Sequence, residues 1–222
     1  IEILSSSTNL AGLGEVVSSF ELYMDEELIF ESTRMLTATS LLEDEESPFT
    51  DVEVTDKNYD AIKFLYDYAI VAGYDDGTFR PDNTINRAEL IKVLVEGIGV
   101  SPDANNFNSC FPDVTHEWFA KYVCYAKDEG WISGYPDGNF RPGDPVNKVE
   151  ALGMLLHCEE IERSDQWTIE FSDVRPEDWF APSVQTASEL GLLEETGLIF
   201  YPAADRDRKA MDANLYRLIT YL

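Results

Sequence analysis

The sequence has few cysteines, no long apolar run and little positive charge, and each shortage excludes a class of protein. Three cysteines and two histidines in 222 residues do not suit a disulfide-based scaffold or a zinc site. No apolar stretch reaches the roughly 20 residues of a membrane-spanning helix. Because 43 acidic residues face 16 basic ones, the net charge of −27 argues against nonspecific binding of nucleic acid or anionic membranes. An anionic ligand would have to be held locally, against this field.

One motif, in contrast, occurs three times. Phe-x-Asp-Val stands at 49–52, 111–114 and 171–174, roughly 60 residues apart, which is typical of repeated supersecondary units. Each copy is followed by a predicted helix with aromatic and small residues, a turn-forming loop, and a second helix. We therefore predict three repeats, over 49–105, 106–168 and 169–222, after an N-terminal segment over 1–48.

The N-terminal segment lacks the full repeat. Residues 4–19 are rich in serine and small apolar residues, which favours a loosely held arm. Residues 33–42 have apolar residues at helical spacing, like the second helix of a repeat whose first half is missing. The acidic residues 43–46 and the following Ser47-Pro48 indicate a linker. A start at Ile1 is expected of a processed or excerpted chain.

Two of the three cysteines lie within the second repeat. A Cys110–Cys124 disulfide would close a short loop and suit an extracellular protein, and two free thiols are the alternative. Cys158 lies on the apolar side of a later predicted helix and is interpreted as a small buried residue.

The loops share a pattern in the first two repeats. Residues 73–81 and 134–142 both read Gly-Tyr-x-Asp-Gly-x-Phe-Arg-Pro, in which Asp-Gly is typical of a tight turn. In the third repeat, residues 195–202 keep Gly, Phe and Pro but lose Tyr-x-Asp. A binding surface built by this loop should be weakest there. Asp75 and Asp76 form a weak candidate pair for Ca²⁺, although no EF-hand loop is present.

The start of each second helix carries a cation. Asn86 and Asn147 each precede a glutamate by three residues, as in a capping box. The residue after the cap is Arg87, Lys148 or Arg208, and a cation in the first turn opposes the helix dipole. Exposed N–H groups beside a cation would bind an anion. Pairing of each cation with a carboxylate of this acidic chain is the alternative.

Together these motifs resemble the S-layer homology domain in three tandem copies. The resemblance implies a mainly α fold, in which three helix-loop-helix repeats form a pseudo-threefold helical bundle with grooves between neighbouring repeats. It also implies an extracellular, cell-surface module that binds secondary cell-wall polysaccharide, often through pyruvyl ketal groups, without covalent attachment.

Several residues match groove positions of that family. Arg87 matches the arginine of its helix-start tetrapeptide, whereas Lys148 replaces that arginine and Arg208 lacks the following glutamate. Because lysine offers no bidentate fork, the Lys148 groove should be less selective for a carboxylate. The resemblance implies further ligand contacts from the capping asparagines, loop glycines and helix aromatics: Asn86, Asn147, Gly73, Gly77, Gly134, Gly138, Trp118 and Trp179, with Tyr59 in place of the tryptophan in the first repeat.

Two functions follow from the sequence. The first is non-catalytic anchoring to an acidic cell-wall glycan, with no cofactor and no enzymatic activity. The second is a self-assembling S-layer or filament subunit, which docks through its N-terminal arm and uses divalent cations such as Ca²⁺ to suppress repulsion.

Overall fold

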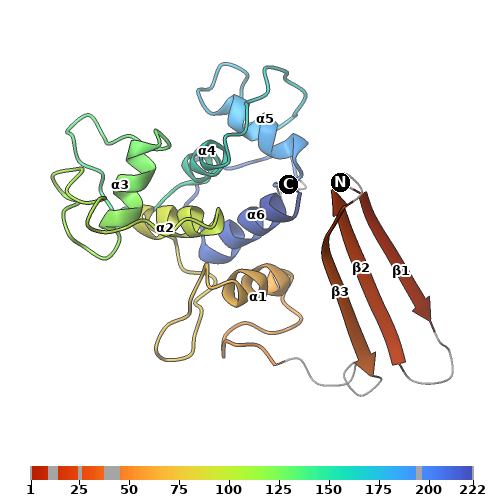
Figure 1. Ribbon diagram of the computed structural model, residues 1–222. Coiled ribbons are helices and arrows are strands. Elements are labelled where there is room, and N and C mark those ends of the chain that lie inside the picture. Colours follow the sequence, from red (N-terminus) through yellow and green to blue (C-terminus); the bar gives the residue numbers. More distant parts are fainter. Residues whose placement is uncertain (1, 10–14, 25–26, 38–45, 194–196, 222) are drawn as a thin grey trace. The chain divides into compact units, whose positions relative to one another are not determined.

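The computed structural model describes residues 2–9, 15–24, 27–37, 46–193 and 197–221 (Figure 1). The chain divides into two compact units, residues 1–46 and 47–222, and each is described by itself.

The first unit is an antiparallel sheet of three strands in the order β1-β2-β3. The strands are β1 (Glu2–Asn9), β2 (Glu15–Met24) and β3 (Glu27–Thr37). The predictions of a loose arm over 4–19 and of a helix from residue 33 are therefore wrong for the described residues; 10–14 and 38–45, the latter including most of the predicted linker, lie outside them. β-Branched and aromatic residues such as Val16, Val17, Ile29 and Phe30 favour strands. Hydrogen-bonded pairing of the three strands outweighs the short run of apolar residues at helical spacing after residue 33.

The second unit is mainly helical, as predicted, and each repeat contributes two helices. The helices are α1 (Tyr59–Asp67), α2 (Arg87–Gly97), α3 (Ala120–Asp128), α4 (Lys148–Cys158), α5 (Ala181–Glu189) and α6 (Arg208–Tyr221). α3 packs on α2, α5 on α4, and α1 on α6 (Figure 1). The first helix of each repeat thus packs on the second helix of the preceding one, and the series closes on itself.

Three backbone segments meet where the second helices begin. Ile85 N–H donates to Arg206 O at 2.9 Å, Val146 N–H to Ile85 O at 3.2 Å, and Arg206 N–H to Val146 O at 2.7 Å. These bonds form a closed triangle with one member from each repeat. Ile85 and Val146 are buried there, and so is Arg206, at 7% exposure. This triangle is the hub of the pseudo-threefold bundle.

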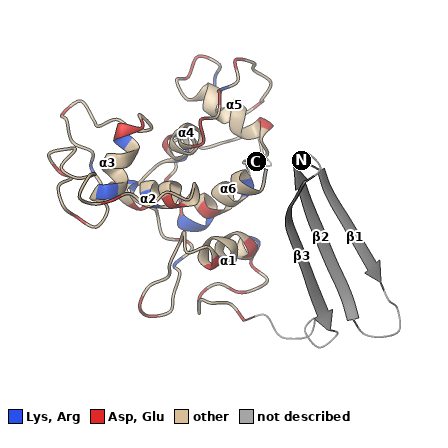
Figure 2. Ribbon diagram, in the orientation of Figure 1, with Lys and Arg blue, Asp and Glu red and all other residues tan. Residues whose placement is uncertain are grey.

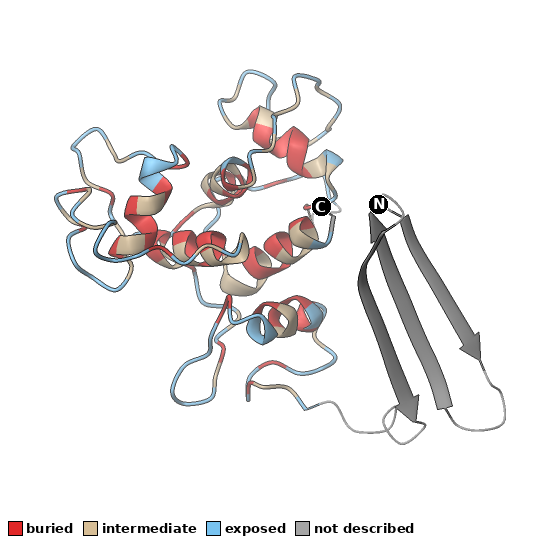
Figure 3. Ribbon diagram, in the orientation of Figure 1, coloured by how far each residue is buried: buried red, intermediate tan, exposed pale blue. Residues whose placement is uncertain are grey.

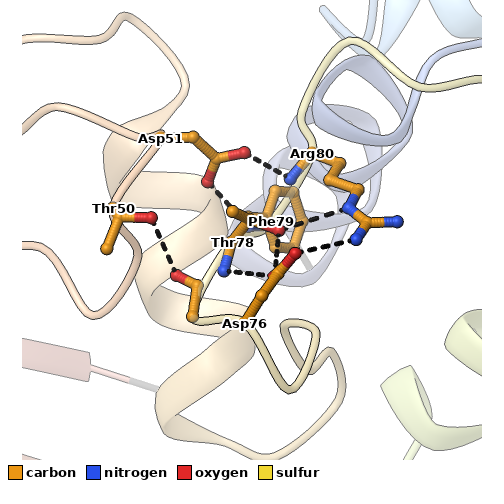
Figure 4. Close-up of polar contacts among 7 residues, drawn as sticks. Thr50, Asp51, Asp76, Thr78, Phe79 and Arg80 are labelled. Atoms are coloured by element: carbon orange, nitrogen blue, oxygen red, sulfur yellow. Dashed lines mark hydrogen bonds and ion pairs between the residues drawn. The ribbon is translucent and has the colours of Figure 1, made fainter.

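The aspartate of Phe-x-Asp-Val ties each repeat's start to its loop. Asp51 accepts from the backbone N–H groups of Phe79 and Arg80 at 2.7 and 2.8 Å (Figure 4). Asp113 and Asp173 make the same pair of bonds in the second and third repeats. The third repeat therefore keeps this local structure although its loop sequence has diverged.

The core is continuous through the three repeats. The helices carry most of the buried residues, and the loops are largely exposed (Figure 3). Cys110 and Cys124 form a disulfide, and Cys158 is buried as a free thiol. Acidic residues are spread over all three repeats (Figure 2). Among the described helices, none combines the length and apolar character needed to cross a bilayer.

Candidate functional site

The cation at the start of each second helix reaches the loop of the next repeat. Arg87 Nε donates to Phe140 O at 2.9 Å, and Lys148 Nζ donates to Phe200 O at 2.6 Å. The Arg208 guanidinium lies 4.6 Å from the centre of the Phe79 ring. The three cations thus link the first repeat to the second, the second to the third and the third to the first, as the packed helices do. Each cation lies at a junction between repeats.

The helix N-termini themselves are already occupied. Arg87 N–H and Ala88 N–H donate to Asp144 O and Pro142 O, both at 3.0 Å, and Asn86 accepts from the next N–H group within a complete capping box. Equivalent backbone bonds hold the starts of α4 and α6. The hypothesis that exposed helix N–H groups bind an anion is therefore wrong, because loop carbonyls of the neighbouring repeat take these donors.

Groove 1 is the cavity beside Arg87, lined by the segment 131–135, by α4 and by Trp179 and Ser183 of the third repeat. Its volume is about 430 Å³. Arg87 is only 4% exposed, and no carboxylate of the described residues lies within ion-pair distance of it. Its guanidinium lies 4.9 Å from the ring centre of Tyr135. A buried cation without an anionic partner is rare.

A second arginine, Arg163, lines groove 1. Its Nε donates to Ser183 Oγ at 2.8 Å, one terminal nitrogen to Gly153 O at 3.3 Å, and the other lies 3.0 Å from His157 Nε2. Burial, together with the charge of Arg163, lowers the pKa of His157 below its ordinary value. The groove thus contains two arginines and a histidine, opposed by Glu150, whose carboxylate accepts from Asn147 N–H.

Sequence reasoning missed Arg163, His157, Trp131 and Tyr135 as groove residues. Arg163 lies near the end of the second repeat and belongs to none of the repeated motifs. Tyr135 belongs to the predicted loop motif, so its aromatic ring next to Gly134 was the one signal that could have identified it.

Groove 2 is the smaller cavity beside Arg208, lined by residues 71–74, by α2, by Trp118 and by Asp212. Its volume is about 190 Å³. Its cation, loop, helix and tryptophan correspond to those of groove 1 moved back by one repeat: Arg208 takes the place of Arg87, and Trp118 that of Trp179. Lys92 takes the place of Gly153 and reduces the open space.

Groove 3, beside Lys148, is closed. Within the described residues it is lined by Lys148, Leu152, Leu193, Phe200, Arg206 and Asn214, and it leaves no room for a water molecule. The predicted weakness of the surface at the third loop agrees with this closure.

The predicted aromatic residues divide into two kinds. Trp118 and Trp179 are 59% and 73% exposed and line grooves 2 and 1. Tyr59 is buried, and its position in α1 corresponds to Ala120 in α3. The residue equivalent to the tryptophans is Lys57, one position before the helix cap, so the match proposed for Tyr59 is wrong.

The local structure requires glycine at each of the four predicted loop positions. Gly73 and Gly134 line grooves 2 and 1, and a Cβ atom at either would lie less than 3.0 Å from a phenylalanine ring and a loop carbonyl. Gly77 and Gly138 have φ angles of +80° and +83°, which the turn requires, and they line neither groove.

The weak Ca²⁺ candidate has other partners. Asp76 accepts from Thr78 and pairs with Arg80 at 2.9 Å, and these contacts lower its pKa to about 2 (Figure 4). The described residues contain no group of three or more acidic, histidine or cysteine side chains that could hold a metal ion.

Comparison with known proteins supports the repeats. Residues 48–91 and 111–152 match the sequence model of the S-layer homology domain, which confirms the predicted family for the first and second repeats. A cellulosome-anchoring protein of Acetivibrio thermocellus is 31% identical over 122 residues, which is 54% of this chain and 27% of that protein. A surface layer protein of Brevibacillus choshinensis is 36% identical over 106 residues, 46% of this chain and 10% of that protein.

An enzyme is also among the relatives. An endoglucanase of a Bacillus species is 26% identical over 168 residues, which is 73% of this chain and 18% of that protein. The chain thus spans at most 27% of the length of these three relatives. The domain match and the surface-layer and anchoring relatives agree with the predicted cell-surface location.

Proposed function

We propose that this chain is a non-catalytic anchoring module that binds an acidic cell-wall polysaccharide through groove 1. The observation that carries the proposal is the pair of arginines, Arg87 and Arg163, which line one cavity and face no carboxylate within ion-pair distance among the described residues. In a chain of net charge −27, this local surplus of positive charge is what an anionic ligand needs.

The shape of groove 1 also suits a sugar. Trp131, Tyr135 and Trp179 supply ring faces beside the two arginines. Aromatic faces pack on the apolar faces of sugar rings, while the guanidinium groups bind a carboxylate with two parallel hydrogen bonds. The ligand that fits is a sugar unit with a carboxylate substituent, such as a pyruvyl ketal.

The relatives supply the biological setting of the proposal. The names of the cellulosome-anchoring and surface layer proteins connect the shared segment with attachment at the cell surface. We extend the domain assignment to residues 169–222 as a third copy, because Asp173 repeats the loop contacts of Asp51 and Asp113. The partner is accordingly a secondary cell-wall polysaccharide.

Two variants test the site in different ways. Arg87→Gln removes the charge and should reduce retention on purified cell-wall sacculi by about tenfold or more. Gly153→Leu removes no charge: Gly153 lines groove 1, and no atom lies within 4 Å of the place that its Cβ atom would take, so the larger side chain should fill the groove without disturbing the core. It should also abolish retention while the helix, freed of a mid-helix glycine, stays stable.

The controls separate the groove from general charge. Arg175→Gln removes the same charge at an exposed loop position outside the described grooves and should bind like the unaltered chain. Sacculi whose carboxylates have been amidated should lose binding of every variant. Full retention by both Arg87→Gln and Gly153→Leu would refute the assignment.

A second candidate function is assembly into a surface layer or filament. It is favoured by the sheet of the first unit, whose outer strands β1 and β3 each pair on one side only within the described residues. An outer strand can accept a strand from another copy. The proposal includes Ca²⁺ as a counterion, and it predicts Ca²⁺-dependent sedimentation that is lost on deletion of residues 1–46. A chain that stays monomeric with Ca²⁺ would contradict it.

A further inference from the structure

α6 carries a carboxylic acid in the core of the bundle. Asp212 is 2% exposed, and its Oδ2 atom has no hydrogen-bond partner within the described part of the chain. No cation of the described residues lies within ion-pair distance of it. A buried carboxylate without a partner costs much more free energy than the neutral acid. The stability of the folded chain should therefore depend on the ionisation of this one group.

The other two repeats place an aliphatic residue at the same position. Counting from the first residue of each second helix, the fifth residue is Ile91, Leu152 or Asp212. Ile91 and Leu152 belong to the apolar core. The fold thus accepts an apolar side chain here, and the carboxyl group of Asp212 is not needed to build the bundle.

Charged groups around Asp212 come from α6 itself and from α2, which packs on α6. Burial raises the pKa of Asp212 to about 7; Arg208 and Lys92 act against this and lower it, and Asp207 raises it further. Glu89 of α2 lines the same cavity as Asp212, and its carboxylate accepts from a backbone N–H group in the capping box. The nearby cations therefore offset only part of the effect of burial.

The charged groups of α1, the other helix packed on α6, lie away from the core. Asp60 is exposed, and Lys63 pairs with Asp67, which is also exposed. In the loop of the first repeat, Tyr74 lines the same cavity as Asp212 and is 36% exposed.

We propose that Asp212 is a pH-sensitive element of ring closure: its ionisation places an unpaired charge between α6 and α2 and loosens α6 from the first repeat. α6 closes the ring because it packs on both helices of the first repeat (Figure 1). Just before this helix, Arg206 accepts from Ile85 N–H in the hub triangle. The closed ring should thus be firmer in mildly acidic than in alkaline conditions, whatever the grooves bind.

The direction of the effect follows from the pKa of Asp212 in the two states. It is about 7 in the folded chain and has its ordinary value of 3.8 in the unfolded chain. Between these pH values the unfolded chain has lost the proton that the folded chain keeps. The unfolding equilibrium constant should therefore rise by about tenfold per pH unit on this account. The contribution to stability is fully present below pH 3.8, is lost as the pH rises to about 7, and changes no further above.

The test compares unfolding of the second unit in the full chain with that in Asp212→Leu and Asp212→Asn. In urea, the ratio of the unfolding equilibrium constants, unaltered chain to variant, should rise by about tenfold per pH unit from pH 5 to about 7 and level off above about pH 8. The ratio cancels the contributions of His157 and of the other acidic groups. Asp128→Asn, which removes an exposed carboxylate at the end of α3, is the control, and its ratio should stay flat above about pH 5.

Hydrogen exchange locates the effect at the closure. At about pH 8 the Ile85 amide should exchange about tenfold faster or more in the unaltered chain than in Asp212→Asn, and at about pH 5 the two chains should exchange alike. If Asp212→Leu does not fold, Asp212→Asn, which keeps the size of the side chain, carries the whole comparison. The proposal is overturned if the ratio for Asp212→Asn stays constant across this pH range, or if the Ile85 amide exchanges equally in both chains at about pH 8.

Discussion

At the scale of single residues, Arg87 shows how a site can be set apart within an acidic protein. The chain has 43 acidic residues, yet Arg87 is 4% exposed and meets the carbonyl of Phe140 rather than a carboxylate. The carbonyl fixes the position of the guanidinium without neutralising it. The charge is therefore available to the anionic ligand that we propose, and Arg163, held by Gly153 of α4 and Ser183 of α5, adds to it.

His157 should make anion binding in groove 1 dependent on pH. Its pKa lies below the ordinary 6.5 because of burial and of Arg163, and a bound anion would stabilise the protonated ring. Glucuronate affinity should therefore rise as the pH falls from about 7.5 to 5, and fall below about pH 4 as carboxylates protonate. Calorimetric titration should show this rise in the unaltered chain and a flat profile in His157→Gln. Identical pH profiles for the unaltered chain and His157→Gln would exclude His157 as the cause of the pH dependence.

The lowered pKa of His157 also makes the stability of the ligand-free chain depend on pH. The unfolded chain binds the His157 proton at an ordinary pKa of 6.5, above the pKa in the folded chain. The unfolded state is therefore favoured as the pH falls below 6.5, and this group's contribution to the free energy of unfolding declines until the folded pKa is passed. In His157→Gln, the free energy of unfolding should lose the part of its decline below pH 6.5 that is due to His157.

Gly134→Ala should destabilise the second repeat. A Cβ atom there would lie 2.8 Å from Phe111 Cε1 and 2.9 Å from the backbone carbonyl of Asn139, which cannot move independently of the loop. We expect a loss of about 1–3 kcal/mol in the free energy of unfolding, measured with urea. Gly143→Ala, where no atom lies within 4 Å, is the matched control and should change little. Equal effects of the two substitutions would contradict the steric explanation.

At the scale of secondary-structure elements, local signals predicted structure well and distant pairing did not. The capping boxes of α2 and α4 involve residues three apart, so Asn86 and Asn147 could be identified directly. The bonds from the helix starts to the carbonyls of the next repeat's loop span more than 50 residues and left no local trace. The sheet of the first unit was missed for a different reason, because its strands are neighbours in the sequence: the apolar residues at helical spacing after residue 33 were weighed above the β-branched and aromatic residues that favour strands.

The candidate site was predictable to a similar extent. Arg87, Gly134 and Trp179 belong to repeated motifs and were found, but they come from three different repeats. Nothing in their spacing showed that they share one cavity with Arg163, which is part of no motif. Trp118 and Trp179 lie before their helices and are exposed, whereas Tyr122 lies within α3 and is buried.

Reduction of the Cys110–Cys124 disulfide should destabilise the chain while leaving it folded. The bond closes a loop of 14 residues in sequence separation between the start of the second repeat and α3. Loss of a cross-link over such a loop costs about 2–4 kcal/mol, mainly by freeing the unfolded chain. Urea unfolding with and without a phosphine reductant measures the loss. A Cys110→Ser, Cys124→Ser variant should be insensitive to reductant, and an unchanged midpoint in the fully reduced protein would contradict the expectation.

At the scale of the whole molecule, the second unit differs from an open solenoid because its repeats close into a ring. α1 packs on α6, and the hub triangle joins Ile85, Val146 and Arg206. An open array loses one interface when a terminal repeat is removed, and the rest stays folded. Here grooves 1 and 2 each need parts of three repeats, so binding at these grooves would depend on the same closure as folding.

Deletion of residues 169–222 should therefore abolish cooperative folding of the second unit. It removes α6 from α1, takes the Arg206 carbonyl from Ile85 N–H, and deprives groove 1 of Trp179. Calorimetry should show no sharp transition, and hydrogen exchange at the Ile85 amide should become fast. Deletion of residues 1–46, a separate compact unit, is the control and should leave the transition of the second unit in place. A sharp transition in the chain that ends at residue 168 would show that the first two repeats fold without closure.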